Sequence, residues 1–393
     1  MNKANLSRGI LFFVTVVFWF AQYAYTPFVN PQLITMGVTA SVMGFIGGAY
    51  GFTQFIFRIP VGIAADKWQK KFFICAGCLS AGLAALCMLV FQNPVGFLVG
   101  RALGGVAASS WVPFTVLYSS YYKPEHATRA IATINLASQL GRFFSFLVAA
   151  LVASWFGAQA AFLISTIGGF SGFFMSLLVR EKTGDEDSPA GKKPVAFREL
   201  LAVGKERTVL VTSMLATFVQ IIAFSTHAGF TANHAVYIGA SLAQLGYVQL
   251  ALLLPSILLG FALSKYILQR VDAKPLVVLG FAATVLYCLI VPFTSTILQL
   301  YAVQVIGGVG STLTFSLLMG LCVQNIAAEK RGAAMGFFQS IYGIGMTTGP
   351  IIMGFITDYA GLRYGFFFMG GVAGVSTLVS AIFLHRSKTG KAA

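Results

Sequence analysis

The sequence predicts an all-α membrane protein that crosses the bilayer twelve times, and two observations lead to that prediction. Hydrophobic residues make up 57% of the 393 positions and charged residues only 9%, whereas an average soluble domain carries about 25% charged residues. Apolar runs of about 20 residues, the length that crosses a hydrocarbon core about 30 Å thick, recur along the whole chain. Runs this long and continuous predict helices, because the strands of a membrane barrel are shorter and alternate in polarity.

The twelve runs lie at residues 9–31, 42–64, 72–91, 95–119, 130–153, 159–179, 208–231, 242–264, 275–293, 297–322, 333–356 and 364–384. The first run is too long, and lacks the small-residue cleavage site, for a removable signal peptide. All five cysteines fall inside the runs, which argues against a disulfide framework or a zinc site. The sequence has no recognisable nucleophile–base pair, metal cluster or phosphate-binding loop, so we expect no enzyme activity, no metal and no cofactor.

The location of the basic residues explains the net charge of +15. They precede the first run and follow the second, fourth, eighth and tenth: Lys3, Arg8, Lys67, Lys70, Lys71, Lys123, Arg129, Lys265, Arg270, Lys274, Lys330 and Arg331. The alternate connections, 35–41, 92–94, 157–159, 233–240 and 294–296, carry no charged residue. By the positive-inside rule we expect a multi-pass protein of the cell (inner) membrane with both termini in the cytoplasm. Anionic lipid headgroups, and not nucleic acid, are the expected partners of these residues.

A polar stretch divides the chain into two halves. Because residues 181–207 are rich in Gly, Ser, Pro, Asp, Glu and Lys, we expect a six-helix lobe at 1–180, a cytoplasmic linker at 181–207 and a second six-helix lobe at 208–393. Three positions recur between the halves: Gly104-Gly105-Val106 at Gly307-Gly308-Val309, Arg129 at Arg331, and Gly141 at Gly345. Tandem repeats of this kind build two bundles around a site near the membrane midplane.

Three motifs point to a known family. The second run is followed by Gly62-Ile-Ala-Ala-Asp66-Lys67-Trp-Gln-Lys70-Lys71, the fourth has an R-x-x-x-G pattern at Arg101 and Gly105, and the eleventh contains Gly345-Met-Thr-Thr-Gly349-Pro350-Ile-Ile-Met-Gly354. With twelve spans and a central loop, the chain resembles the major facilitator superfamily over essentially its whole length. The resemblance implies two lobes that rock about a central cavity lined by the first, fourth, seventh and tenth helices, which gives alternating access, and it makes a monomer the default.

The resemblance also assigns roles to the motif residues. It implies a cytoplasmic gating loop formed by Gly62, Asp66, Lys67, Lys70 and Lys71, with Gln69 at a position where the family pattern prefers glycine. The matching place in the second half, Gly260-Phe-Ala-Leu-Ser264-Lys265, lacks the aspartate, so only the first copy is expected to act as a latch. Close helix packing or bending is expected at Gly105, Gly349, Pro350 and Gly354.

The fifth run departs from the drug–proton antiporters of the superfamily. They commonly carry G-P-x-x-G-G there, whereas this chain has Gly141-Arg142-Phe-Phe-Ser145-Phe146, with an arginine at the proline position. Arg58, Arg101 and Arg142 all lie inside predicted spans, where a central arginine costs roughly 2.5–3.5 kcal/mol unless it is paired or faces a polar interior. Asp358 is the nearest approach to an acid within a span. A rise of about 1.5 Å per residue places Arg142 near the middle of the membrane.

Polar side chains line four helix faces, one of which contains Arg142, and they add no negative charge. The four faces comprise Asn135, Ser138, Gln139, Arg142 and Ser145; Trp19, Gln22, Tyr23, Thr26 and Asn30; Ser213, Thr217, Gln220 and His227; and Gln304 and Ser311. A cationic interior without acids favours an anionic substrate, because guanidinium binds carboxylate or phosphate bidentately. The candidate substrate-binding residues are therefore Arg142, Arg101, Arg58, Gln22, Tyr23, Asn135, Gln139, Gln220, His227 and Gln304.

Several of these residues have an alternative interpretation. Arg58 could snorkel to the interface or bond a carbonyl, and the resemblance ties the position of Arg101 to helix packing or proton coupling. His227 could be a proton carrier or a satisfied polar residue. His234 is expected in a loop between spans.

These observations predict a secondary active transporter that moves a small organic anion, a carboxylate or a phosphorylated metabolite, by exchange or by proton symport. The alternative is proton-coupled efflux of drugs or amphiphilic compounds, which the aromatic content favours and the missing fifth-helix motif opposes. A sensor or a lipid-handling protein is a third class, which would need an output domain or a lipid-open groove. The substrate, the direction of transport and the coupling ion do not follow from the residues.

Overall fold

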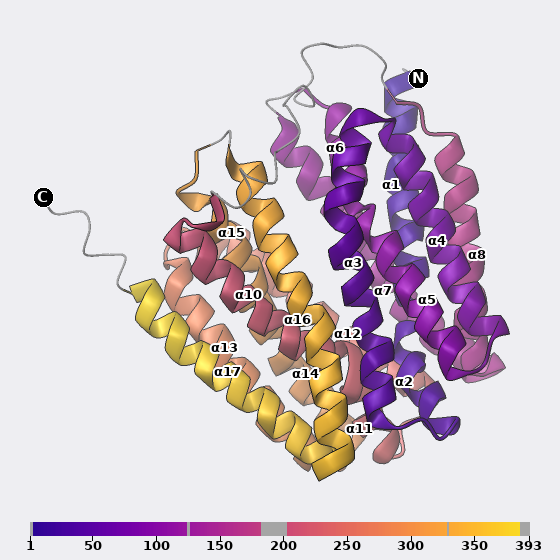
Figure 1. The fold of residues 1–393 in the computed structure, drawn as a ribbon, viewed down its shortest axis with the longest axis vertical. Coiled ribbons are helices and arrows are strands. Elements are labelled where there is room, and N and C mark those ends of the chain that lie inside the picture. Colours follow the sequence, from indigo (N-terminus) through magenta and orange to yellow (C-terminus); the bar gives the residue numbers. More distant parts are fainter. Residues whose placement is uncertain (1–2, 124–125, 182–202, 328–329, 386–393) are drawn as a thin grey trace, which may run out of the picture. The chain divides into compact units, whose positions relative to one another are not determined.

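The protein is described by a computed structural model that covers residues 3–123, 126–181, 203–327 and 330–385 (Figure 1). All regular structure in these ranges is helical, and twelve helical segments are long and apolar enough to span a membrane, as predicted. The segments are α1 (Lys3–Tyr23) with α2 (Thr26–Thr35), α3 (Ala40–Lys67), α4 (Lys70–Val90), α5 (Pro94–Ser109) with α6 (Trp111–Ser120), α7 (Ala127–Phe156), α8 (Ala158–Leu177), α10 (Arg207–Ser225) with η3 (Thr226–Phe230) and α11 (Thr231–Tyr237), α12 (Leu242–Ala262) with η4 (Leu263–Ile267), α13 (Ala273–Ile290) with η5 (Val291–Phe293), α14 (Ile297–Ser311) with η6 (Thr312–Ser316) and α15 (Leu317–Gln324), α16 (Arg331–Ala360) and α17 (Leu362–His385).

Local signals set several helix ends. The Asn93 side chain accepts the Gly96 N–H at the start of α5, and Ser241 and Thr296 form capping boxes that begin α12 and α14. The two 30-residue helices α7 and α16 both end at a glycine with positive φ, Gly157 at +83° and Gly361 at +98°. Only glycine adopts this conformation without a steric cost, so each glycine ends its helix and begins the turn into the next.

Five spans are interrupted, and the interruptions lengthen or bend them. The first span breaks between α1 and α2, the fourth at Ser110, and the seventh, eighth and tenth contain π-helical turns. The seventh span therefore continues to Tyr237. This contradicts the expectation that His234 lies in a loop: it is buried in α11, and its ring nitrogen Nε2 lies 2.8 Å from Thr294 Oγ1.

The helices form two compact units. The first contains Met1–Gln32 and Ala49–Pro194, and the second contains Leu33–Gly48 and Val195–Ala393, so α3 contributes to both. Most of the predicted linker, residues 182–202, lies outside the described residues.

Glycines let the helices of each unit approach closely. In the first unit, a Cβ added to Gly141 of α7 would lie 2.5 Å from Val16 O of α1. In the second unit, a Cβ at Gly345 of α16 would lie 2.3 Å from Thr217 O of α10. The repeat between Gly141 and Gly345 in the sequence is thus matched by equivalent packing, because both positions bring backbone against backbone.

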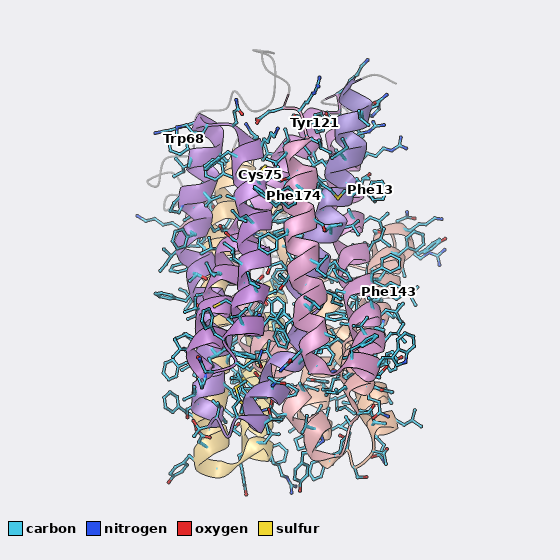
Figure 2. All side chains as sticks on the ribbon, turned by 90° about the vertical axis from the view of Figure 1, so that its right-hand side faces the viewer. Phe13, Trp68, Cys75, Tyr121, Phe143 and Phe174 are labelled. Carbon is cyan, nitrogen blue, oxygen red and sulfur yellow. The ribbon has the colours of Figure 1, made fainter. Side chains whose placement is uncertain are left out.

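The outer surface of the first unit is apolar. Phe13 and Phe174 expose 61% and 63% of their surface on its helices (Figure 2). Large exposed apolar side chains are unfavourable in water and match a lipid environment. Polar side chains of the unit are also buried, among them Gln22, Arg101 and Ser145, and the candidate site lies among these.

Candidate functional site

Arg142 on α7 lies against two aromatic rings of α1. Its guanidinium carbon is 4.7 Å from the centroid of the Trp19 ring and 4.6 Å from that of Tyr23. Trp19 and Tyr23 are one helical turn apart and therefore share a face. The contact depends on Gly141, because the close approach of α7 to α1 at this residue brings its neighbour Arg142 to that face.

The two rings lie on one side of the guanidinium. Their centroids are only 5.6 Å apart, far less than the sum of the two ring-to-guanidinium distances that a sandwich would require. The arginine thus gains a cation–π attraction, worth about 0.5–2 kcal/mol depending on desolvation, while these rings leave its opposite face uncovered. Its buried Nε has no hydrogen-bond partner among the described residues.

Arg101 on α5 is the second arginine inside this unit, and 7% of its surface is exposed. Its guanidinium carbon is 4.7 Å from the centroid of the Tyr50 ring, and the guanidinium also interacts with the Tyr25 hydroxyl. The Gln22 amide nitrogen donates to Gly104 O at 2.9 Å. One turn of α5 therefore gathers groups from α1, α3 and the α1–α2 break.

The two arginines belong to one cluster. The Tyr50 phenol lies within electrostatic reach of both guanidinium groups and of the Tyr23 and Tyr25 hydroxyls. Several buried polar atoms of the cluster make no hydrogen bond of normal geometry to a described residue: Trp19 Nε1, Gln22 Oε1, Tyr25 Oη, Arg101 Nε and Arg142 Nε. Most of these are donors, and unsatisfied buried donors are costly until an acceptor meets them.

No described carboxylate pairs with Arg101 or Arg142. The ion pair found in the described chain joins Lys70 Nζ to Glu181 Oε1 at 3.8 Å, at the start of α4. The cluster thus carries two positive charges and a surplus of hydrogen-bond donors. This arrangement suits a ligand that brings negative charge and acceptor oxygens.

The remaining candidates of the first unit differ from one another in exposure and in hydrogen bonding, which the sequence pattern does not show. Ser138 and Ser145 donate to the carbonyls of Asn135 and Arg142 on their own helix, at 2.7 and 2.6 Å. Asn135 is exposed and Gln139 half-buried. Arg58 on α3 is buried and already makes an interaction within the chain.

A separate polar cluster surrounds His227 in the second unit. The His227 and Tyr287 rings lie 4.4 Å apart, and the Tyr287 hydroxyl hydrogen-bonds Thr231 Oγ1 at 2.6 Å. The Gln249 amide donates to the His227 carbonyl at 2.8 Å, because the π turn at η3 changes the backbone pairing there. Gln304 is fully buried beside the imidazole, and neither its amide atoms nor His227 Nδ1 makes a hydrogen bond of normal geometry to a described residue.

A narrow cavity adjoins this cluster. Its volume is about 10 Å³, and its polar lining comes from His227, Thr284, Ser311 and Thr314. A space of this size admits one water molecule at most. Gln220, on the same helix as His227, is half-buried. The candidate residues of the second unit are therefore neutral, whereas those of the first are cationic.

The motif that ends α3 and begins α4 is anchored by Glu181, which the sequence analysis did not single out. The backbone N–H groups of Lys70 and Lys71 donate to the Glu181 carboxylate at 3.3 and 3.2 Å, and Lys71 Nζ donates to Leu177 O at 2.6 Å. A carboxylate is favourable at a helix N-terminus. Lys67 is exposed, a Cβ on Gly62 would meet nothing within 4 Å, and the side chain of Asp66 lies outside the described residues.

Tyr25 and Tyr50 are the other residues that sequence reasoning missed. Tyr25 lies in the break between α1 and α2, so the periodicity of one continuous helix misplaces it. The available signal is Pro27, because proline has no N–H to donate to the carbonyl four residues earlier, that of Tyr23, and so interrupts the helix there. Tyr50 reaches Arg101 from another helix, and spacing along a chain gives no such information.

The helix-packing candidates all lie at close backbone contacts. A Cβ on Gly105 would lie 2.1 Å from Tyr50 O, and one on Gly349 would lie 2.4 Å from Ile221 O. Within the second unit, Gly354 approaches Ala40 O, and the Pro350 carbonyl approaches Gly44. These contacts fix the helices that carry the cluster residues.

Comparison with known proteins shows which family this chain belongs to. The sequence model of the Major Facilitator Superfamily matches residues 11–233 and 213–393. The chain belongs to the major facilitator superfamily. It is therefore a multi-pass membrane protein of a transporter family whose members move small-molecule solutes.

Relatives within the superfamily are distant but cover most of the chain. An uncharacterized MFS-type transporter of Methanocaldococcus jannaschii is 23% identical over 364 residues, 90% of this chain and 91% of that protein. The gentisate transporter of Corynebacterium glutamicum is 24% identical over 375 residues, with coverage of 90% and 81%. The multidrug resistance protein MdtG of Enterobacter lignolyticus is 22% identical over 372 residues, with coverage of 92% and 88%.

Solved structures of the superfamily share the fold. A bacterial homologue of the human lysosomal transporter Spinster has a TM-score of 0.80 and 14% identity, and the match covers 98% of this chain and 97% of that one. The nucleoside transporter NupG has a TM-score of 0.72 and 15% identity, with coverage of 98% and 99%. At these identities the likeness shows the superfamily fold alone.

Proposed function

We propose that this transporter carries a small organic anion, a carboxylate or a phosphorylated metabolite, by exchange or proton symport, and that Arg142 is its principal binding residue. One observation supports the proposal above the others. The Arg142 guanidinium is held against Trp19 and Tyr23 on one side, and no described carboxylate neutralises it. Because arginine keeps its charge at any physiological pH, an anionic ligand would satisfy it.

The alternative is efflux of drugs or amphiphilic compounds. The aromatic side chains around Arg142 favour it, since Trp111 packs on Trp19 at 5.2 Å and Phe146 on Tyr23 at 5.9 Å between ring centroids. Relatives named multidrug resistance proteins also favour it. Among relatives, the gentisate transporter favours the anion, because gentisate is an aromatic carboxylate. Two uncompensated arginines oppose a cationic drug, because like charges repel in a low-dielectric interior.

The proposal includes an orientation. Both termini would face the cytoplasm of a cell (inner) membrane, because the basic residues cluster before the first span and after the second, fourth, eighth and tenth spans. The protein would act as a monomer, with membrane lipids around its apolar surface.

A thermal-shift screen of the purified protein tests the choice between anion and cation. The panel contains metabolite anions and lipophilic cations, and the screen is repeated with Arg142→Gln. Arg363→Gln is the matched control, because Arg363 also lies over two aromatic rings, those of Phe293 and Phe367, but is exposed and outside the cluster.

Stabilisation by one class of anion that disappears in Arg142→Gln and persists in Arg363→Gln would support the proposal. Stabilisation by cations that does not depend on Arg142 would overturn it and favour efflux.

A further inference from the structure

The two arginines of the first unit are linked through tyrosines. Arg142 lies against the Tyr23 ring, and Arg101 lies against the Tyr50 ring. The helical turn that carries Tyr23 comes close to Tyr50 at Gly104, where an added Cβ would lie 3.5 Å from Tyr50 Cδ2 and 3.4 Å from Oε1 of Gln22, the residue before Tyr23. The Tyr50 phenol also lies within electrostatic range of both guanidinium groups. A ligand that meets Arg142 is therefore in the electrostatic field of Arg101 as well.

The acidic side chain that the structure describes in this unit does not balance either charge. Glu181 is occupied at the start of α4, where it accepts the N–H groups of Lys70 and Lys71 and pairs with the Lys70 ammonium. The tyrosines contribute ring faces and hydroxyl dipoles, which attract a cation but do not neutralise it. The described part of the cluster thus has a net charge of +2, from Arg101 and Arg142.

The surrounding donors are suited to oxyanions at more than one point. Trp19 Nε1 and Arg142 Nε are buried at one end of the cluster without a hydrogen-bond partner among the described residues. Arg101 Nε is likewise unpartnered at the other end, where the guanidinium also interacts with the Tyr25 hydroxyl. Gly104, between them, is bordered by Tyr25 Oη at 3.1 Å and Gln22 Oε1 at 3.4 Å from an added Cβ. Each group of donors has its own guanidinium. The pair therefore matches a ligand with two negative charges, carried either on two separate groups or on a single group.

We propose that the cluster selects dianions over monoanions, with Arg142 binding the first negative charge and Arg101 acting as the residue that requires the second. The inference rests on the proposed function and narrows it to dicarboxylates and phosphate monoesters. A monoanion would leave one guanidinium uncompensated in a low-dielectric interior, which is unfavourable. Arg101 is the more deeply buried of the two, so its charge is the harder one for water to screen.

Pairs of probes that differ by one methyl ester, and therefore by one negative charge, test this inference. Succinate is compared with its monomethyl ester at pH 8, and glycerol 3-phosphate with its methyl phosphodiester. The half-saturating concentration for thermal stabilisation of the purified full chain is measured for each. We expect the wild-type protein to bind at least one dianion about tenfold more tightly than its monoanionic partner.

Variants separate charge from structure, because the dianion-to-monoanion ratio is taken within each protein and a general loss of stability cancels. Arg101→Gln should reduce the ratio to about one while monoanion binding persists, and Arg101→Lys should keep the preference because it keeps the charge. Arg142→Gln should lose both probes.

The outcomes distinguish the inference from the proposed function. Equal binding of a dianion and its ester by the wild type, or an unchanged ratio in Arg101→Gln, would overturn the dianion inference and leave the anion carrier standing. Binding of no anion of either charge, together with binding of lipophilic cations, would overturn both.

Discussion

The Asp358 carboxylate, near the end of α16, accepts the backbone N–H of Ser41 at 2.8 Å, although 317 residues separate the two. The same oxygen, Oδ2, also accepts from the Ser41 hydroxyl, and the other oxygen, Oδ1, accepts the N–H of Ala40 at 2.8 Å. These N–H groups belong to the first turn of α3, which has no partners for them within its own helix. The one acid within a described span therefore caps a helix, and it is not available to pair with the arginines.

We expect Asp358→Asn to lower the thermal stability of the purified protein, because the variant loses the charge that favours a helix N-terminus and weakens charge-assisted hydrogen bonds. The expected loss is about 1–2 kcal/mol. Tyr359→Phe is the control, because Tyr359 is the neighbouring residue and 96% exposed. Equal melting temperatures for the two variants would contradict a capping role.

Gly141 should tolerate no side chain. An added Cβ would overlap the Val16 carbonyl, which is backbone and cannot rotate away, so Gly141→Ala should force α7 from α1 and cost about 1–3 kcal/mol. Gly62→Ala is the matched control, because nothing lies within 4 Å of its Cβ and alanine favours a helix. Destabilisation by Gly62→Ala and not by Gly141→Ala would refute this packing.

Trp19 should matter for ligand binding through Arg142. Removing its ring in Trp19→Leu takes away one of the two surfaces that orient the guanidinium, so we expect anion affinity to fall about three- to tenfold, as one cation–π contact is worth roughly 0.5–1.5 kcal/mol. Trp155→Leu controls for loss of a tryptophan on α7 that is 75% exposed. An unchanged half-saturating concentration in Trp19→Leu would show that Arg142 does not need this ring.

The hydrogen bond between Thr231 and Tyr287 should stabilise the second unit. Tyr287→Phe leaves a fully buried threonine hydroxyl without this partner, and Thr231→Val leaves the buried phenol without it. Each change should cost about 1–2 kcal/mol, and the double variant should cost less than the sum, because the same bond is lost once. Strict additivity of the melting shifts would show that the two groups are not coupled.

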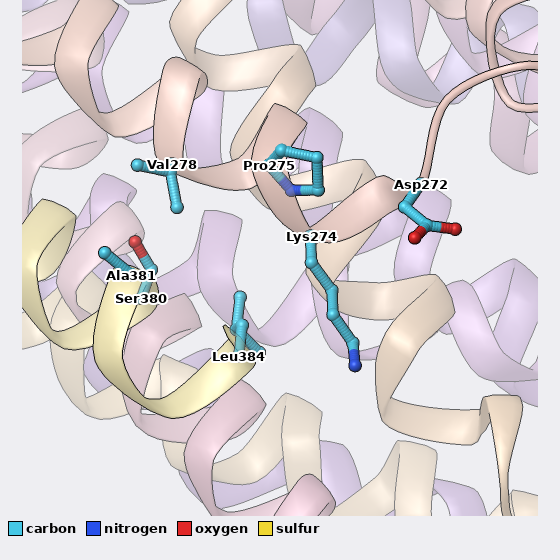
Figure 3. A pocket seen from close by; sticks show the side chains of 7 residues that line it. All are labelled: Asp272, Lys274, Pro275, Val278, Ser380, Ala381 and Leu384. Carbon is cyan, nitrogen blue, oxygen red and sulfur yellow. The ribbon is translucent and has the colours of Figure 1, made fainter. Parts of the chain in front are cut away.

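Figure 3 shows a larger cavity of the second unit, of about 330 Å³, whose lining includes Asp272, Lys274, Ser380 and Leu384. It lies between the start of α13 and the last turn of α17. Asp272 and Lys274 are already engaged in other interactions. We assign it no role in the transport proposal, which rests on the first-unit cluster.

Composition and period predicted the membrane architecture, because a helix that crosses lipid must satisfy its own backbone and therefore shows its length in the sequence. They also placed Arg142 on one face with its α7 neighbours, since side chains at i+3 and i+4 share a face, and the role of these residues in binding remains a prediction. Periodicity could not predict what breaks a span, so it misplaced His234 and overlooked Tyr25. It also could not predict the contacts of Tyr50, Glu181 and Asp358, because these depend on which helices are neighbours in space.

The most direct test of the central claim is anion uptake by proteoliposomes that contain the purified protein. The labelled substrate is the anion that stabilises it most strongly. We predict uptake above that of protein-free liposomes, loss of at least nine-tenths of it in Arg142→Gln, which removes the positive charge that the ligand needs, and normal uptake in Arg363→Gln. Uptake that is unchanged in Arg142→Gln, or movement of a lipophilic cation in place of the anion, would contradict the account.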